Sequence, residues 1–198
     1  MTNIISGNEL KEGSYKPYKK EGVFNPETNN ITENTIPKSE YWLSIDSRNY
    51  TVESKSLISV YDVAEYILRK LGELTTMKLH KLLYYCQAWS LVWDEKPLFP
   101  EEIEAWANGP VVKDLFSYHR GQYSVSNISI GNPNLIHGNE KVTIDSVLDY
   151  YGNKSAQWLI ELTHMEDPWK MARKGLEPTE RGKNVITYDL MSDYYSAL

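Results

Sequence analysis

Cysteine is nearly absent from this chain of 198 residues, and the one present is Cys86. A single thiol excludes an internal disulfide and a zinc site built from several cysteines. Because Cys86 lies inside an apolar run with helical periodicity, we expect it to be a small buried side chain rather than a reactive thiol.

Long apolar runs and basic clusters are also missing. No stretch approaches the length of a membrane span, and no apolar segment follows a basic start at the N-terminus, so the sequence predicts a cytoplasmic protein without a membrane contact. The longest basic run is Lys19-Lys20, and the formal net charge is −6. Because nucleic-acid binders gather Lys and Arg to neutralise phosphates, we expect no nucleic-acid partner.

Aromatic residues are plentiful but uneven in kind, with fifteen Tyr and six Trp against three Phe. Tyr and Trp combine an apolar body with a polar group, which suits half-buried surfaces and contact patches. Apolar residues make up 41% of the chain, which is enough for a real core. This composition indicates a globular protein and is compatible with a contact patch for a partner.

The chain divides in composition near residue 57. Residues 1–57 are rich in Gly, Pro and Asn and poor in aliphatic residues, so we expect an extended N-terminal arm. Within it, 41–53 has the pattern of a short β-hairpin, with Tyr41 and Trp42 in its first strand. Residues 58–198 carry helical periodicity and are predicted to form one mainly α, compact multi-helix domain around a central buried helix, with a small β-hairpin or flap.

Two helices are well marked at the start of this domain. Ser59 and Asp62 have the spacing of a capping box, and apolar residues then recur every three or four positions until Gly72. Thr76 is expected to cap the next helix, which is apolar nearly all round from Leu82 onward and should be the central one.

The remaining segments give shorter patterns. Pro100 and the acids after it predict a short helix through Ile103 and Trp106 that stops at Gly109-Pro110, because proline and carboxylates favour a first helical turn. A further helix is expected from Val111 to Arg120, and a hairpin or irregular flap between Tyr123 and Ile144. The last helices are expected at 145–151, 155–165, 169–174 and 187–197.

The four histidines do not form a metal motif. No pair has the spacing of a helical zinc site, His80 is expected on the exposed side of the central helix, and no phosphate-binding loop or serine-nucleophile motif occurs. The one cluster of histidine with acids is His164 with Glu166 and Asp167, at a helix end where local capping bonds are the commoner role. We therefore expect neither a cofactor nor a catalytic centre; an enzyme using His164 and Glu166 is the minor alternative.

Three segments resemble one known family. Residues 76–89, with the sequence TMKLHKLLYYCQAW, resemble the signature helix of the SocA-type antitoxin domain, also called Panacea and found in GepA-like phage-associated proteins. Residues 96–99 and the stretch from Glu102 to Val111 follow in the family's order, and residues 162–169 resemble its second signature. His80 and Cys86 stand where the family pattern has Gln and Ala, and residues 1–57 lie outside the resemblance.

The resemblance implies an antitoxin of a toxin–antitoxin system that neutralises a cognate protein toxin by direct binding. It also implies a toxin gene adjacent to this one and an association with prophages. The alternative within the same fold is a proteolytic adaptor, as in one relative that delivers its toxin to the ClpXP protease, or a phage accessory protein that targets a host protein. The residues we expect to bind the partner come from the arm and from two places where a Trp lies near a proline at a change of chain direction. They are Tyr41, Trp42, Trp106, Gly109, Pro110, Val111, His164, Glu166, Pro168 and Trp169.

Overall fold

A computed structural model describes residues 17–20 and 58–198, so Tyr41, Trp42 and the hairpin predicted at 41–53 lie outside the described residues. The helices are α1 (Val60–Leu71), α2 (Thr76–Trp93), α3 (Lys113–Tyr118), α4 (Gly138–Tyr151), α5 (Ala156–Met165), α6 (Asp167–Ala172) and α7 (Tyr188–Ser196), with a 3-10 turn η1 (Pro133–Leu135). The strands are β1 (Leu74–Thr75), β2 (Ile103–Trp106), β3 (Gly109–Val112) and β4 (Ser124–Val125). The mainly α fold with small β elements is confirmed.

Helix α1 begins as the sequence predicts. The Ser59 side chain accepts the N–H of Asp62, while the Asp62 carboxylate accepts the Ser59 N–H, which completes the capping box. Gly72 ends the helix with a positive φ of 78°. Helix α2 is capped by Thr75 rather than by the predicted Thr76, since the Thr75 hydroxyl accepts the N–H of Lys78.

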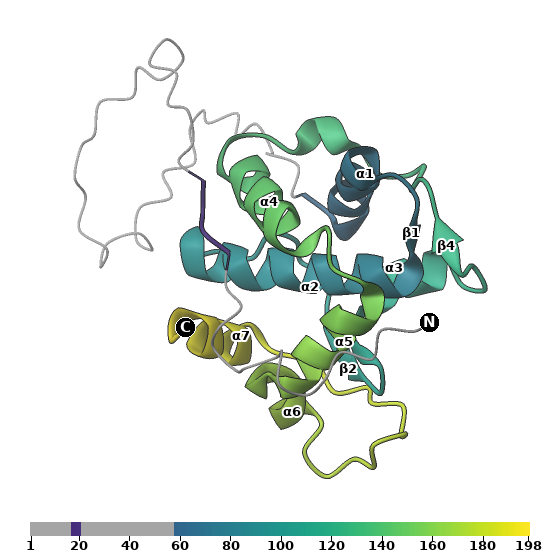
Figure 1. The fold of residues 1–198 in the computed structure, drawn as a ribbon, viewed down its shortest axis with the longest axis vertical. Coiled ribbons are helices and arrows are strands. Elements are labelled where there is room, and N and C mark those ends of the chain that lie inside the picture. The colour runs from purple at the N-terminus through teal and green to yellow at the C-terminus, as the bar shows by residue number, and fades with distance from the viewer. Residues whose placement is uncertain (1–16, 21–57) are drawn as a thin grey trace, which may run out of the picture. The chain divides into compact units, whose positions relative to one another are not determined.

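Helix α2 is the central element, as expected. Every residue from Leu79 to Ser90 is buried, because α2 is packed on several sides at once. Figure 1 shows α1 and α4 along one side of α2, with α5, α6 and α7 along the other. Of these helices, α1, α4, α5 and α7 pack directly on α2. Cys86 is fully buried within this core, as predicted. Within the described residues, no helix combines the length and apolar character needed to cross a membrane.

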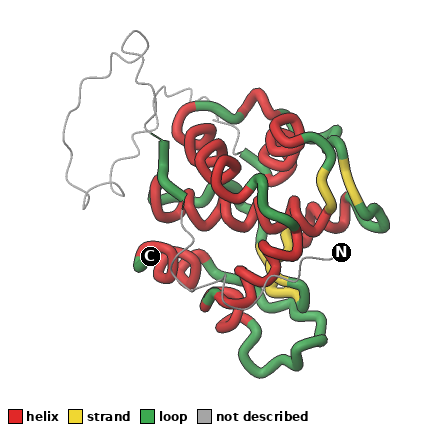
Figure 2. The backbone as a smooth tube through the Cα atoms, in the orientation of Figure 1, coloured by secondary structure: helices red, strands yellow, loops and turns green. Residues whose placement is uncertain are grey.

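The prediction of a helix through Ile103 and Trp106 is wrong, because these residues form strand β2. Strand β2 pairs antiparallel with β3 in a tight hairpin, drawn in yellow in Figure 2. Gly109 starts β3 with a φ of 96°, a conformation that favours glycine. Pro110 is tolerated inside the strand because the residue opposite, Ala105, donates its N–H to Asn184 O instead.

Several other bounds differ from the prediction. The helix expected at 111–120 is the shorter α3, because Val111 and Val112 belong to β3. In the predicted flap, Ser124–Val125 pairs with Leu74–Thr75, and α4 already begins at Gly138 instead of Asp145. The helix expected at 169–174 is α6, which starts at Asp167.

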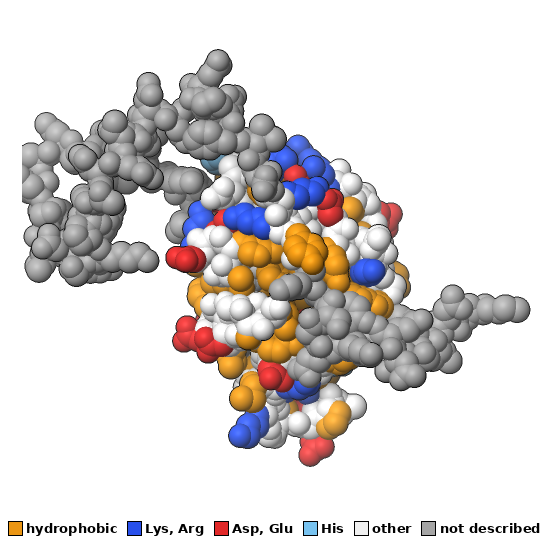
Figure 3. All heavy atoms as spheres, turned by 60° about the vertical axis from the view of Figure 1, so that its left-hand side comes forward, with side chains coloured by type: hydrophobic (Ala, Val, Ile, Leu, Met, Phe, Trp, Pro, Cys, Tyr) orange, Lys and Arg blue, Asp and Glu red, His pale blue; other side chains and the backbone are white. Residues whose placement is uncertain are grey.

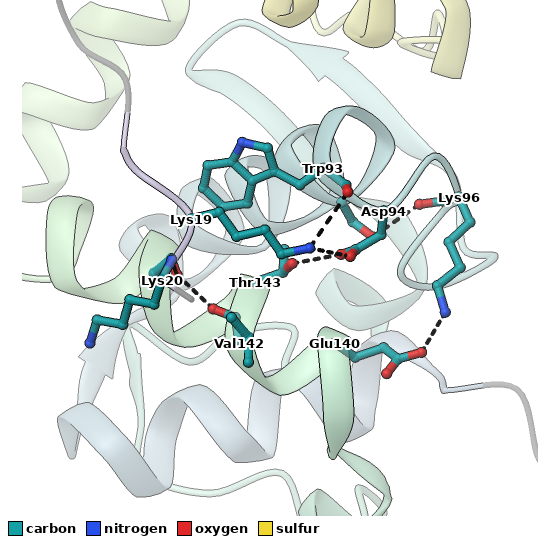
Figure 4. Close-up of polar contacts among 10 residues, drawn as sticks. Lys19, Lys20, Trp93, Asp94, Lys96, Glu140, Val142 and Thr143 are labelled. Carbon is teal, nitrogen blue, oxygen red and sulfur yellow. Dashed lines mark hydrogen bonds and ion pairs between the residues drawn. The ribbon is translucent and has the colours of Figure 1, made fainter. Parts of the chain in front are cut away.

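Residues 17–20 lie against the C-terminal end of α2. Pro17 is buried there, next to a groove between Trp93 of α2 and Tyr195 of α7. Figure 3 shows that hydrophobic side chains form a band across this face, with Lys and Arg side chains above it. In Figure 4, Lys19 points at Asp94. The Lys20 N–H donates to the Ser146 hydroxyl, 2.9 Å away.

Candidate partner-binding site

The three segments that carry the resemblance meet around the β2–β3 hairpin. Lys81 of α2 donates through Nζ to Pro110 O at 3.0 Å. The indole N–H of Trp169, at the start of α6, donates to Trp106 O at 2.9 Å. The structure thus brings residues from α2, the hairpin and the α5–α6 corner together, although they are far apart in the sequence.

Gly109 fits tightly between these elements. A Cβ atom on Gly109 would lie 2.5 Å from Lys81 Cε and 2.9 Å from Thr163 Oγ1. No ordinary contact is that short, so the hairpin reaches α2 and α5 only because residue 109 has no side chain. Gly109 and Pro110 are buried, and their role is to position the hairpin.

The Trp106 ring is held in one orientation. Its Nε1–H donates to the Glu104 carboxylate at 2.7 Å, and Lys113 Nζ lies 3.6 Å from the same carboxylate. Phe116 of α3 packs edge-on against the ring, with the centroids 4.7 Å apart. A half-buried indole held by a hydrogen bond and by an aromatic neighbour makes a rigid contact element.

A pocket of about 300 Å³ opens beside this indole. Its walls come from the N-terminal turns of α2, the hairpin with its turn, α3 and the segment after α6. The lining is mostly apolar and includes Met77, Trp106, Val111 and Phe116, with Asn108 and Arg181 among the polar residues. A concave apolar pocket with a few polar groups is the usual form of a binding site.

The segment after α6 also belongs to the site, although none of the residues expected to bind the partner lies in it. The Arg173 guanidinium is buried and donates to Ala105 O of β2 at 2.9 Å and to the backbone carbonyls of Glu177 and Glu180. Arg181 follows, with its guanidinium stacked 3.8 Å from the Trp106 ring centroid. The only sequence signal for these roles was the Arg181-Gly182 pair, which by itself is uninformative.

Lys81 has an unusual environment for an amine. Its side chain is fully buried, and this burial lowers the pKa of the ammonium group to about 7. Near neutral pH a large share of the molecules therefore hold a neutral amine beneath the hairpin.

His80 is buried, so the prediction that it lies on the exposed side of α2 is wrong. Its Nδ1 accepts the N–H of Val112, which leaves the proton on Nε2 to be donated to His119 Nε2 at 3.0 Å. Burial, followed by the nearby Lys81 charge, holds the pKa of His80 well below its usual value, and burial also lowers that of His119. The pair is thus a neutral hydrogen-bonded unit; among the described residues no group of three or more His, Cys, Asp or Glu is placed to hold a metal ion.

His164 and Glu166 face different surroundings. The His164 ring stacks on Trp169, with centroids 4.0 Å apart, and burial lowers its pKa. The Glu166 side chain is 3% exposed and accepts hydrogen bonds from Tyr195 at 2.6 Å and Tyr85 at 3.1 Å. Glu166 therefore ties α7 to α2 from inside, and Pro168 is also buried.

The surface that these residues build consists of Trp106 and the half-buried His164–Trp169 stack, and the buried Val111 lines the pocket beside Trp106. Glu166, Gly109, Pro110 and Pro168 support it from beneath. Whether a partner binds there stays a prediction.

Residues 79–170 match the family model described as antitoxin SocA-like, Panacea domain. No curated protein and no solved structure matches the chain. The matched segment runs from the first turn of α2 to α6, so it includes the central helix, the hairpin and the α5–α6 corner.

Proposed function

We propose that this chain, which carries a SocA-like Panacea antitoxin domain over residues 79–170, binds a protein toxin directly and thereby neutralises it. The toxin is the product of an adjacent gene, and the complex forms in the cytoplasm of a cell that carries the pair, on a prophage or a similar element. The observation that carries the proposal is the convergence of two of the resembling segments, residues 76–89 and the stretch from Glu102 to Val111, on one preorganised pocket beside Trp106.

The chemistry of this surface suits protein binding. Trp and Arg are the residues that most often dominate the energy of protein–protein contacts, and here Trp106 and Arg181 stack on each other at the pocket. The pocket of about 300 Å³ has room for one large apolar side chain of a partner. The hydrogen bonds of Glu104 and Trp169 fix the hairpin beforehand, which lowers the entropic cost of binding.

The test is co-expression of the full chain with the product of the adjacent gene. We expect growth to be rescued, and we expect the two proteins to elute together in size-exclusion chromatography without any protease. Trp106→Ala should weaken the complex by about 2 kcal/mol or more, the loss typical of a dominant contact residue. Asn108→Arg, a change at an exposed position of the hairpin turn, should also weaken it by blocking the pocket without touching the core.

The matched control is Tyr18→Ala. Tyr18 is 84% exposed and lies at the other end of α2, so its loss should leave the complex intact. Full rescue by both Trp106→Ala and Asn108→Arg would exclude the hairpin as the binding surface. A stable complex in which the toxin stays active would exclude direct neutralisation and support the adaptor role instead.

A further inference from the structure

The backbone that carries Arg181 is held in place by the hairpin. A Cβ atom on Gly182 would lie 2.1 Å from Ala105 O, so this glycine lies flat against strand β2. Beyond it, Asn184 O accepts the Ala105 N–H at 2.8 Å, and Val185 forms a β-bridge with Glu104. The segment thus extends the hairpin by a third, irregular strand, and Arg181 is placed by backbone contacts on its C-terminal side.

Contacts on the other side of Arg181 come from Arg173. Its Nη2 donates to Glu177 O at 2.7 Å and to Glu180 O at 2.9 Å, directly before Arg181. Backbone carbonyls collected around a buried guanidinium cannot shift independently of one another. Arg181 is therefore presented from a preorganised turn, despite its exposure.

The Arg181 side chain is stacked but keeps its donors available. The guanidinium carbon lies 3.8 Å from the Trp106 ring centroid and 5.6 Å from that of Phe116. Within residues 17–20 and 58–198, no acceptor forms a hydrogen bond or ion pair with its N–H groups. Stacking on an aromatic face orients a guanidinium without using its N–H groups, so the planar edge remains open to a carboxylate.

We infer that Arg181 and the pocket beside Trp106 form a receptor for a partner segment in which an apolar side chain is followed by Asp or Glu. The apolar side chain enters the pocket between Met77, Val111 and Phe116, and the side-chain carboxylate accepts two N–H bonds from Arg181. This inference rests on the proposed function, because the segment belongs to the protein partner.

Charge complementarity argues for this occupant. An exposed guanidinium at the rim of an apolar pocket favours an anion beside an apolar group, and the planar guanidinium edge matches the two oxygens of a carboxylate in a strong bidentate interaction. A side-chain carboxylate is flexible enough to reach the Arg181 edge while the preceding residue fills the pocket.

A test that needs no toxin uses two blocked dipeptides, acetyl-Leu-Glu-amide and acetyl-Leu-Gln-amide. They differ only in the charge of the second side chain. Titration of the full chain, followed by the indole N–H resonance of Trp106 in NMR spectra, should give a dissociation constant about tenfold lower for the Glu peptide, which corresponds to about 1.4 kcal/mol. Arg181→Ala should remove this difference, whereas Lys183→Ala, which removes an exposed charge two residues away, should keep it.

Three results would overturn the inference: equal binding of both dipeptides, binding of neither, or a preference for Glu that survives Arg181→Ala. A third peptide, acetyl-Leu-Gln with a free C-terminal carboxylate, tests the other source of the anion. If it binds as tightly as the Glu peptide, the receptor recognises a chain end instead, and the proposed segment with a side-chain carboxylate is wrong.

The same variants separate this inference from the proposed function. With the product of the adjacent gene, Arg181→Ala should raise the dissociation constant about tenfold, and Arg181→Lys should restore only part of it, because lysine cannot form the two-pronged contact. A toxin complex that forms normally with Arg181→Ala contradicts the receptor alone. Absence of any complex with the unaltered chain contradicts the proposed function, whatever the dipeptides show.

Discussion

Lys19 Nζ lies 2.6 Å from the Asp94 carboxylate, which joins two residues 75 positions apart in the sequence. The Asp94 side chain is only 2% exposed, and its second oxygen accepts the Thr143 hydroxyl at 2.6 Å. Lys19 is 28% exposed, and its Nζ also lies 3.5 Å from Trp93 O. Figure 4 shows the Lys19 side chain pointing toward both Trp93 and Asp94. The ammonium group thus covers a nearly buried carboxylate at the C-terminal end of α2.

Lys19→Ala should destabilise the domain by about 1–2 kcal/mol, because it leaves the Asp94 carboxylate with little water and no cation beside it. This loss is smaller than the loss expected for a fully buried ion pair, since Lys19 is partly exposed. Urea unfolding at constant m-value measures the change. The control is Lys20→Ala, whose partner Asp149 is 60% exposed and whose loss should be hard to detect. Equal midpoints for the two variants would contradict a structural role for the Lys19 pair.

Lys81→Met should change how stability depends on pH. The pKa of Lys81 is about 7 in the folded chain and 10.5 in an ordinary environment, so between these values the unfolded state holds more protons. The stability of the unaltered chain relative to Lys81→Met should therefore rise with pH from about 7 to about 10, by at most about 1.4 kcal/mol per pH unit. Urea unfolding at pH 7, 8 and 9 tests this, with the exposed Lys174→Met as control; a difference that does not vary with pH would refute it.

The His80–His119 pair predicts a loss of folding stability at acidic pH. Folding lowers the pKa of both histidines. As the pH falls below about 6.5, the unfolded state therefore binds more protons than the folded state, and the free energy of unfolding decreases. In His80→Gln the amide can accept the Val112 N–H and donate to His119 without titrating. Thermal unfolding between pH 7 and pH 5 should show a smaller loss for His80→Gln; an identical loss would locate the acid sensitivity elsewhere.

Gly109→Ala should destabilise more than Gly175→Ala. Both glycines have a positive φ, 96° and 89°, so each substitution carries a conformational cost of about 1–2 kcal/mol. At Gly175 nothing lies within 4 Å of the new Cβ, whereas at Gly109 it meets Lys81 Cε at 2.5 Å. The difference between the two unfolding free energies therefore reports the close approach of the hairpin to α2. If Gly109→Ala costs no more than Gly175→Ala, that approach tolerates a side chain.

Local signals in the sequence were enough for several elements. The reciprocal bonds of Ser59 and Asp62, the stop at Gly72 and the burial of Cys86 follow from capping chemistry and from apolar periodicity, which involve neighbours along one helix. The three segments that resemble the family were likewise readable, since they are continuous in sequence, and the match over residues 79–170 includes most of them.

Contacts between distant segments decided the rest. Ile103–Trp106 is a strand only because Val111 and the 184–186 segment supply hydrogen bonds on its two sides. Four residues are too few to show the alternation of apolar and polar side chains that predicts a strand from sequence. The sequence marked Trp106 and Trp169 as corner residues, but the roles of Lys81, Arg173 and Arg181 depend on carbonyls and rings contributed by other elements. The sequence by itself determined a mainly helical domain and its similarity to the SocA-like family model over residues 79–170. Tertiary packing alone decided which charged side chains are buried and which one remains open at the pocket, because burial and partner geometry arise only when distant segments meet.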